Sequence, residues 1–195
     1  VDRILDNPIL RPLPEAIPAA PPGSAQDNQA PESTLWNLRM IQADHVWEDL
    51  NVRGKGIIIG QSDSGVQGDH PELIDAYHGK NGNGEKTWFD PWYQSSTPID
   101  IGGHGTHTLG TILGKTVGVA PEAEWIGCVN LARNLGNPGY YLDCMQFMLA
   151  PFPQNGDPFR DGDPTRGAHV LNNSWGCPTV EGCDVSSAPA AVTTV

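Results

Sequence analysis

Short apolar runs alternate with polar, glycine-rich stretches along the chain and predict alternating strands and helices. The run Ile57 to Gly60 is apolar and β-branched without alternation, which is typical of a parallel strand buried on both faces. The other apolar segments are assigned from their spacing to strands at Trp125 to Val129 and His169 to Leu171, and to helices at Trp36 to Leu50, His107 to Leu113 and Tyr140 to Leu149. This order predicts an α/β fold with a parallel central sheet, right-handed crossovers and helices on both faces.

Residues 1–33 form a region without apolar periodicity. They are rich in proline and alanine and include the polar stretch Gly23 to Gln29. This composition is typical of a connecting segment, so we expect a linker, a propeptide remnant or an arm that wraps another domain. The predicted globular domain therefore occupies residues 34–195.

The chain is acidic, and this narrows the range of partners. Asp and Glu outnumber Lys and Arg by 23 to 11, which gives a formal net charge of -12 at pH 7. A surface of this sign repels nucleic-acid phosphates and anionic membranes, so neither is an expected partner. No apolar run approaches the roughly 18 residues that a membrane span needs, and the first residues do not resemble a signal peptide. If the protein is exported, we expect a targeting segment to have been removed.

The four cysteines favour two disulfides over a zinc site, because their spacings lack the short pairs typical of zinc ligands. Cys177 and Cys183 bracket a short polar loop, and Cys128 and Cys144 would form the other pair. Four cysteines allow three connectivities, and unrelated buried thiols are the alternative. If the pairs form, the compartment is oxidising, and we expect a secreted protein, extracellular or periplasmic.

Two segments carry candidate catalytic side chains. Asp63 follows the first predicted strand, and reactive groups of α/β enzymes lie at this end of the sheet. His104 and His107 lie in a run of small residues, where glycine leaves the first imidazole uncrowded. Both segments also have a non-catalytic interpretation. An aspartate before Ser-Gly can cap a turn, and a histidine beside glycine can be a simple loop residue. The two histidines could also bind a metal, but no third ligand with suitable spacing is evident.

The segment Asn172 to Gly176 is a candidate peptide-binding edge, since it continues an apolar strand into polar residues. An edge of this kind can hold an extended peptide by main-chain hydrogen bonds. Ser174, Trp175 and Gly176 would then form the wall of a specificity pocket. The alternative is a strand followed by a simple turn.

Taken in order, these segments resemble the subtilisin-like (S8) serine peptidases, and their motif sequences are most similar to those of the bacillopeptidase F type. The resemblance extends over residues 36–176 and rests on the motifs Gly56 to Val66, His70 to Leu73, His104 to His107, Gly118 to Pro121 and Asn172 to Gly176. It implies that Asp63 and His104 belong to an Asp-His-Ser triad, with His107 as a packing or supporting residue. It also implies that Asp100 lies beside the substrate pocket, on the leaving-group side of His104.

The serine of such a triad is absent from the sequence. No Gly-Thr-Ser turn or Gly-x-Ser-x-Gly motif occurs, and Ser186 and Ser187 stand in an unsuitable setting. The resemblance therefore implies the amino-terminal part of a peptidase domain, incomplete in this chain, which acts on peptides or proteins. We expect a carboxyl-terminal fragment of the same peptidase, carrying the serine, as its partner. The alternatives are a catalytically dead, subtilisin-like peptide-binding protein and a metal-dependent hydrolase that uses Asp63, His104 and His107.

Calcium is the remaining cofactor to consider, because triad chemistry itself requires none. Many members of the family insert a calcium-binding loop after the histidine helix. This chain passes almost directly from Leu113 to Val117, so that site is expected to be missing. The acidic stretch Asp157 to Asp163 offers oxygen ligands for a structural Ca²⁺, although exposed acidic loops are more often solvated surface.

Overall fold

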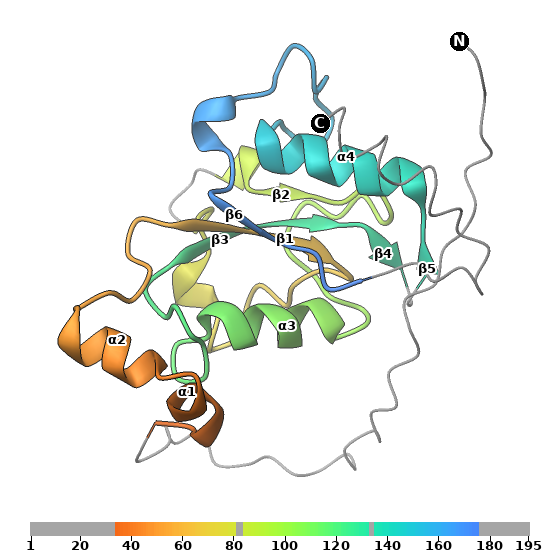
Figure 1. The fold of residues 1–195 in the computed structure, drawn as a ribbon. Helices are drawn as coiled ribbons and strands as arrows, with labels where there is room; N and C mark the ends of the chain where they lie inside the picture. The colour runs from red at the N-terminus through yellow and green to blue at the C-terminus, as the bar shows by residue number, and fades with distance from the viewer. Residues whose placement is uncertain (1–33, 81–83, 133–134, 176–195) are drawn as a thin grey trace, which may run out of the picture.

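A parallel sheet with a helix on each face forms the centre of the computed structural model, which describes residues 34–80, 84–132 and 135–175 (Figure 1). The strands pair in the order β2-β3-β1-β6, with bounds Ile58–Asp63 for β1, Trp88–Phe89 for β2, Glu124–Val129 for β3 and Val170–Asn172 for β6. The covering helices are α3 (His104–Leu113) and α4 (Pro138–Leu149). All three strand pairings are parallel, so the predicted fold class is confirmed.

Strand β3 contributes side chains to two separate cores. Trp125 and Val129 belong to the core on the side of α3. Ile126 and Cys128 belong to the core on the side of α4. Because successive strand residues point to opposite faces, a strand covered on both sides is apolar at nearly every position.

Two short helices, α1 (Trp36–Met40) and α2 (Ala43–Asp49), precede β1 where the sequence predicts a single helix. The break falls at Gln42, whose φ of 59° is incompatible with a continuous right-handed helix. Trp47 anchors α2, because its indole N–H donates to the carbonyl of Val119 at 2.9 Å. The helical character of this segment is confirmed, and its predicted continuity is wrong.

Helix α3 begins at His104, three residues earlier than the apolar pattern predicts. Gly103 precedes it with a φ of 77°, a conformation that favours glycine. Gly105 in its first turn lies against the backbone carbonyl of Gly65, and a Cβ there would overlap with that oxygen. The glycines of this segment therefore let the start of the helix approach the end of β1.

Helix α4 has a defined start. The side-chain oxygen of Asn137 accepts hydrogen bonds from the backbone N–H groups of Gly139 at 2.9 Å and Tyr140 at 3.3 Å. Pro138 occupies the first helical position, where its missing N–H costs no hydrogen bond.

A disulfide joins α4 to the sheet. It links Cys144 of the helix to Cys128 of β3, whose Cα atoms lie 5.6 Å apart. This is one of the two pairs that the sequence predicts. Cys177 and Cys183, which form the other predicted pair, lie outside the described residues, as do residues 1–33 with their predicted linker.

The remaining elements are short, and the sequence pattern did not predict them. Strands β4 (Leu131–Ala132) and β5 (Leu135–Gly136) pair antiparallel, and single 3-10 turns occur at Ile74–Ala76, Gly84–Lys86 and Pro164–Arg166. Within the described ranges no helix is long and apolar enough to cross a membrane.

Candidate active site

Asp63 is the last residue of β1 and is completely buried. Its partner across the ladder is Val129, the last residue of β3, so the two central strands end at the same level. The backbone N–H of Ser64 donates to Oδ1 of Asp63 at 2.6 Å, which fixes the carboxylate. The structure therefore confirms that this aspartate lies at the carboxyl end of a core strand, as the sequence predicts.

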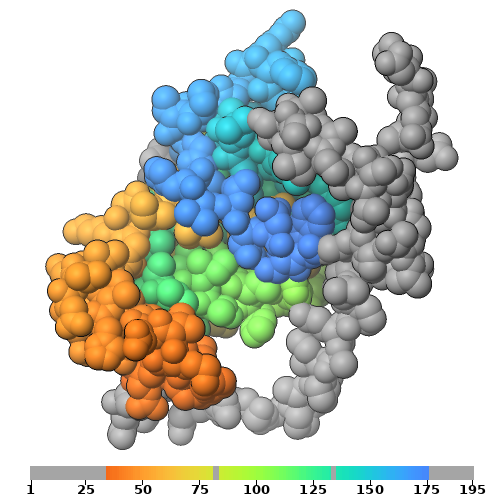
Figure 2. All heavy atoms as spheres, viewed as in Figure 1, coloured from red at the N-terminus to blue at the C-terminus, as the bar shows by residue number. Residues whose placement is uncertain are grey.

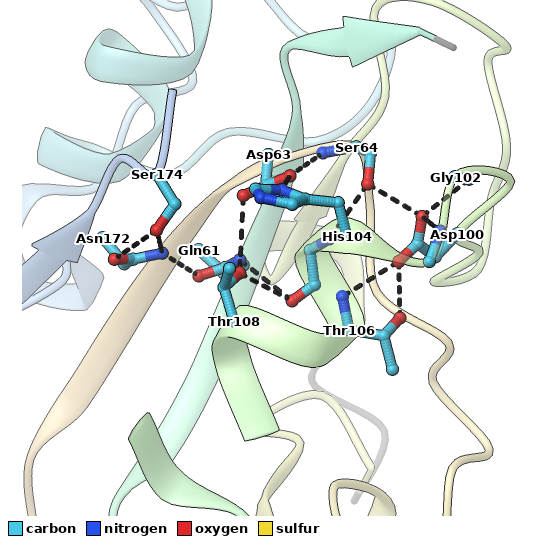
Figure 3. A network of polar contacts seen from close by, with 12 residues as sticks. Gln61, Asp63, Ser64, Asp100, Gly102, His104, Thr106, Thr108, Asn172 and Ser174 are labelled. Atoms are coloured by element: carbon cyan, nitrogen blue, oxygen red, sulfur yellow. Dashed lines mark hydrogen bonds and ion pairs between the residues drawn. The ribbon is translucent and has the colours of Figure 1, made fainter. Parts of the chain in front are cut away.

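His104 faces Asp63 from the first residue of α3 (Figure 3). Its Nδ1 lies 2.7 Å from Oδ1 of Asp63. An ionised carboxylate can only accept hydrogen bonds, so Nδ1 carries the hydrogen and Nε2 carries the lone pair of the neutral ring. The structure thus joins the two residues that the sequence singled out as catalytic, although 41 positions separate them.

Burial dominates the electrostatics of Asp63. Its removal from water raises the pKa of this carboxyl group above the ordinary value, and the hydrogen bonds from His104 and Ser64 offset this only in part. The negative charge of Asp100 raises the pKa further. The ionised carboxylate has little solvent around it, so the hydrogen bond from Nδ1 of His104 stabilises its charge.

Asp100 ties the start of α3 to the end of β1. Its Oδ1 accepts from the hydroxyl of Ser64 at 2.9 Å and from the backbone N–H groups of Gly102 and Gly103 at 3.0 and 2.8 Å. Its Oδ2 accepts from both the N–H and the hydroxyl of Thr106, at 2.9 and 2.6 Å. These bonds hold the loop before His104 against the residue that follows Asp63. The contact of Asp100 with substrate stays a prediction.

Comparison with known proteins decides the family. The sequence profile of the subtilase family matches residues 54–194. The chain belongs to the subtilase family. This confirms the resemblance that the motifs indicate, and it makes the pair of Asp63 and His104 part of a subtilase domain.

The chain is similar in sequence to two curated subtilases and in structure to one of them. Bacillopeptidase F of Bacillus subtilis (strain 168) is 32% identical over 160 residues, which cover 76% of this chain and 11% of that protein. Fervidolysin of Fervidobacterium pennivorans is 32% identical over 181 residues, which cover 86% of this chain and 24% of that protein. The crystal structure of fervidolysin superposes with a TM-score of 0.51 at 25% identity, over 73% of this chain and 20% of that one. The chain therefore spans less than a quarter of the length of these relatives.

His107, the second histidine of the subtilase motif, does not join the pair. Its side chain is exposed on α3, so the packing role predicted for it finds no support in the described structure. Among the described residues no group of three His, Cys, Asp or Glu side chains could hold a metal ion. The metal-dependent alternative therefore gains no support from this geometry.

The acidic loop Asp157 to Asp163 is folded on itself. Asp161 accepts from the N–H of Asp157 at 2.8 Å, and Asp157 accepts from the N–H of Phe159 at 2.9 Å. The hydroxyl of Thr165 donates to Asp163 and lowers the pKa of that exposed carboxyl group. The carboxylates are thus used within the loop, and calcium binding there stays a prediction.

The predicted peptide-binding edge continues from β6, and Figure 2 shows this end of the described chain, in blue, at the surface beside α3, in green. The indole of Trp175 stacks on the ring of Tyr141 in α4, with centroids 3.8 Å apart and an interplanar angle of 7°. One face of the indole is therefore covered, and its role in a specificity pocket stays a prediction. The hydroxyl of Ser174 lies 2.9 Å from Nδ2 of Asn172. Gly176 lies outside the described residues.

Sequence reasoning missed one residue of this site. Gln61 of β1 is buried to 1% exposure and contacts both α3 and β6 (Figure 3). The available signal is a long polar side chain inside a strand that is otherwise built for burial, two residues before Asp63.

Proposed function

We propose that this protein is a secreted serine endopeptidase that hydrolyses peptide bonds with an Asp63–His104–Ser triad. The observation that carries the proposal is the 2.7 Å hydrogen bond between a fully buried carboxylate and Nδ1 of His104, within a subtilase domain. The serine would come from polypeptide outside these residues, either a following segment or a separate carboxyl-terminal fragment. This chain alone is therefore expected to be inactive.

The bonded pair accounts for the proton transfers of the reaction. With Nδ1–H held by Asp63, Nε2 of His104 takes the proton of the serine hydroxyl as it attacks the peptide carbonyl. The imidazolium that forms is stabilised by the Asp63 carboxylate and then gives its proton to the leaving amine. The chemistry needs no cofactor. The donors that stabilise the oxyanion would also have to come from outside these residues.

Two further features support the finer parts of the proposal. The segment from Asn172 to Ser174 continues β6, which runs parallel to β1 toward the end that carries Asp63, and it can pair with an extended peptide substrate through its main chain. The disulfide between Cys128 and Cys144 favours an oxidising compartment, hence secretion to the periplasm or the medium.

Labelling with a fluorophosphonate probe tests the proposal directly. The probe is expected to label the full-length protein, or the assembly with its carboxyl-terminal fragment, on a serine outside residues 1–195. Peptide mapping of the labelled protein locates the serine. His104→Ala is the matched variant and should abolish labelling, since the serine then lacks its base. Label on any serine of this chain, or labelling that survives in His104→Ala, contradicts the proposal, and a folded protein without label supports a peptide-binding relic.

A further inference from the structure

A single buried amide connects the predicted peptide-binding edge to the catalytic pair. Gln61 lies in the central strand β1, with its side chain on the face that α3 covers. It is 1% exposed, and few long polar side chains are buried to this degree without a network that satisfies them. Three hydrogen bonds supply that network.

The direction of the amide is fixed by its partner in α3. Nε2 of Gln61 donates to the carbonyl of Gly105 at 3.0 Å. A carbonyl can only accept, so this contact requires the NH₂ end of the amide to face α3. Oε1 must then face β6, where Nδ2 of Asn172 donates to it at 2.9 Å. The orientation of Asn172 follows, and its Nδ2 and Oδ1 hold the hydroxyl of Ser174 at 2.9 and 3.1 Å.

The other hydrogen of the amide reaches the catalytic aspartate through one residue. Nε2 of Gln61 also donates to the hydroxyl of Thr108 at 2.7 Å. That hydroxyl lies 3.4 Å from Oδ2 of Asp63 and 3.1 Å from the carbonyl of Gly105, so it can donate to either. Gly105 is the residue next to His104. Gln61 therefore contacts the turn that carries the histidine and the hydroxyl that faces the aspartate.

We propose that Gln61 is a positioning residue that holds the peptide-binding edge and the catalytic pair in fixed relation to each other. Its amide bridges Asn172 of the edge to Gly105 and Thr108 of α3. Figure 3 shows Gln61 between Asn172 and Thr108. An apolar residue of similar size would fill the same space but would fix neither neighbour. The inference rests on the proposed peptidase function and adds to it a residue that aligns bound substrate with the base.

The test compares substrates of different length in the full-length protein. Gln61→Leu keeps most of the side-chain volume and removes both ends of the bridge. For an extended peptide that reaches the edge, kcat/KM is expected to fall about 100-fold, the scale of a misplacement near 1 Å, with changes in both KM and kcat. A single-residue ester reaches His104 but not the edge and should lose much less.

Ile59→Ala is the matched control. Ile59 lies two residues earlier in β1, on the same face, and is buried in the apolar core against α3. Its truncation weakens the strand without touching the amide, so short and extended substrates should lose activity by equal factors. Equal factors, or no loss, for Gln61→Leu would overturn the inference. If Gln61→Leu does not fold, Asn172→Ala at the half-buried end of the bridge gives the same comparison of substrate lengths.

A second measurement does not depend on turnover. The hydrogen between Nδ1 of His104 and Asp63 gives a proton NMR signal, whose position reports the geometry of that bond. Gln61→Leu is expected to move the signal, and Ile59→Ala is not. If the signal does not move in Gln61→Leu, the inference about Gln61 is contradicted. If the wild-type protein hydrolyses no peptide, only the proposed function is contradicted, and the NMR measurement still tests the inference.

Discussion

The two faces of the sheet use the same strands for opposite purposes. On the α3 face β1 ends in buried polar groups, including Gln61 and Asp63, which are held by hydrogen bonds. On the α4 face the core is apolar, and three phenylalanine rings meet there with centroids 4.9 to 5.6 Å apart. A buried polar group that loses its partner costs about 1–3 kcal/mol, so the first face tolerates few changes in chemistry. The second face depends on how its apolar side chains fill the space and on the disulfide that joins α4 to β3.

This separation means that substitutions on the two faces should give different phenotypes. Changes to the polar groups beside α3 should mainly affect turnover, and changes to the apolar core beside α4 should mainly affect stability.

The largest effect is expected from His104→Ala on the α3 face. Loss of the general base should reduce kcat of the complete enzyme by about 10⁴-fold or more, the scale known for serine-protease triads, including subtilisin. The melting temperature should fall only modestly, because leaving the buried Asp63 carboxylate without this hydrogen bond costs about 1–3 kcal/mol. Steady-state kinetics and thermal melts measure the two quantities.

His107→Ala is the control for that variant. His107 lies three positions later in α3 and is exposed, so both activity and stability should be nearly retained. If both variants lose activity equally while folded, the two histidines share a function such as metal binding.

The next effect is expected on the α4 face, from Phe147→Ala. Phe147 is fully buried between Phe89 and Phe152, and its truncation should lower the free energy of unfolding by about 3–5 kcal/mol. Under conditions where the variant is folded, kcat/KM should match the wild-type protein. Denaturant titration gives the stability, and Leu142→Ala, at an exposed position of the same helix, is the control with little expected loss. A large drop in kcat would mean that the two faces are coupled.

A smaller loss should follow from opening the Cys128–Cys144 disulfide. The bond closes a loop with a sequence separation of 16, and removing a constraint of this length costs about 3 kcal/mol in the chain-entropy account. The double substitution Cys128→Ala, Cys144→Ala should show this loss, and reductant should then lower its melting temperature less than that of the wild-type protein. A wild-type protein whose melting temperature is unchanged by reductant would contradict the bond.

The smallest expected effect is on stability, has the opposite sign, and is the change in the pH dependence of unfolding in Asp63→Asn. Because burial raises the pKa of Asp63 above 3.8, the folded protein binds more protons than the unfolded chain between 3.8 and the raised value. Stability of the wild-type protein therefore falls as the pH rises through that window. The variant lacks this loss, so its stability relative to wild type should be greater above the window than below it. A relative stability that instead decreases as the pH rises would mean that His104 lowers the pKa of Asp63 overall.

The three longest strands and the residues Asp63 and His104 were predictable because they depend on short, contiguous sequence. Ile57 to Gly60 shows its burial on both faces directly, and the residues around Asp63 and His104 match the subtilase motifs. The break between α1 and α2 was not predictable, since it is set by the backbone of Gln42 rather than by any periodicity. Strand β2 was missed because two residues are too few to show alternation.

The contacts that could not be predicted from the sequence are those between residues far apart in the chain. Asp100 was named from the resemblance, but its hydrogen bond with Ser64, 36 positions away, exists only in the folded loop. Gln61 and Asn172 are 111 positions apart, and neither belongs to a pattern that predicts their contact. Polar networks of this kind are visible only once the register of the strands is known.

The central position of β1 has a consequence for folding during synthesis on the ribosome. Its neighbour β6 follows 111 residues later in the chain, so β1 is synthesised long before its second edge can be covered. At translation speeds of about 5–20 residues per second, the nascent strand waits roughly 5–20 seconds for β6. During that interval its apolar face and open edge are exposed to other nascent chains and to chaperones. The strand that carries Asp63 therefore needs protection from other chains until β6 has been synthesised.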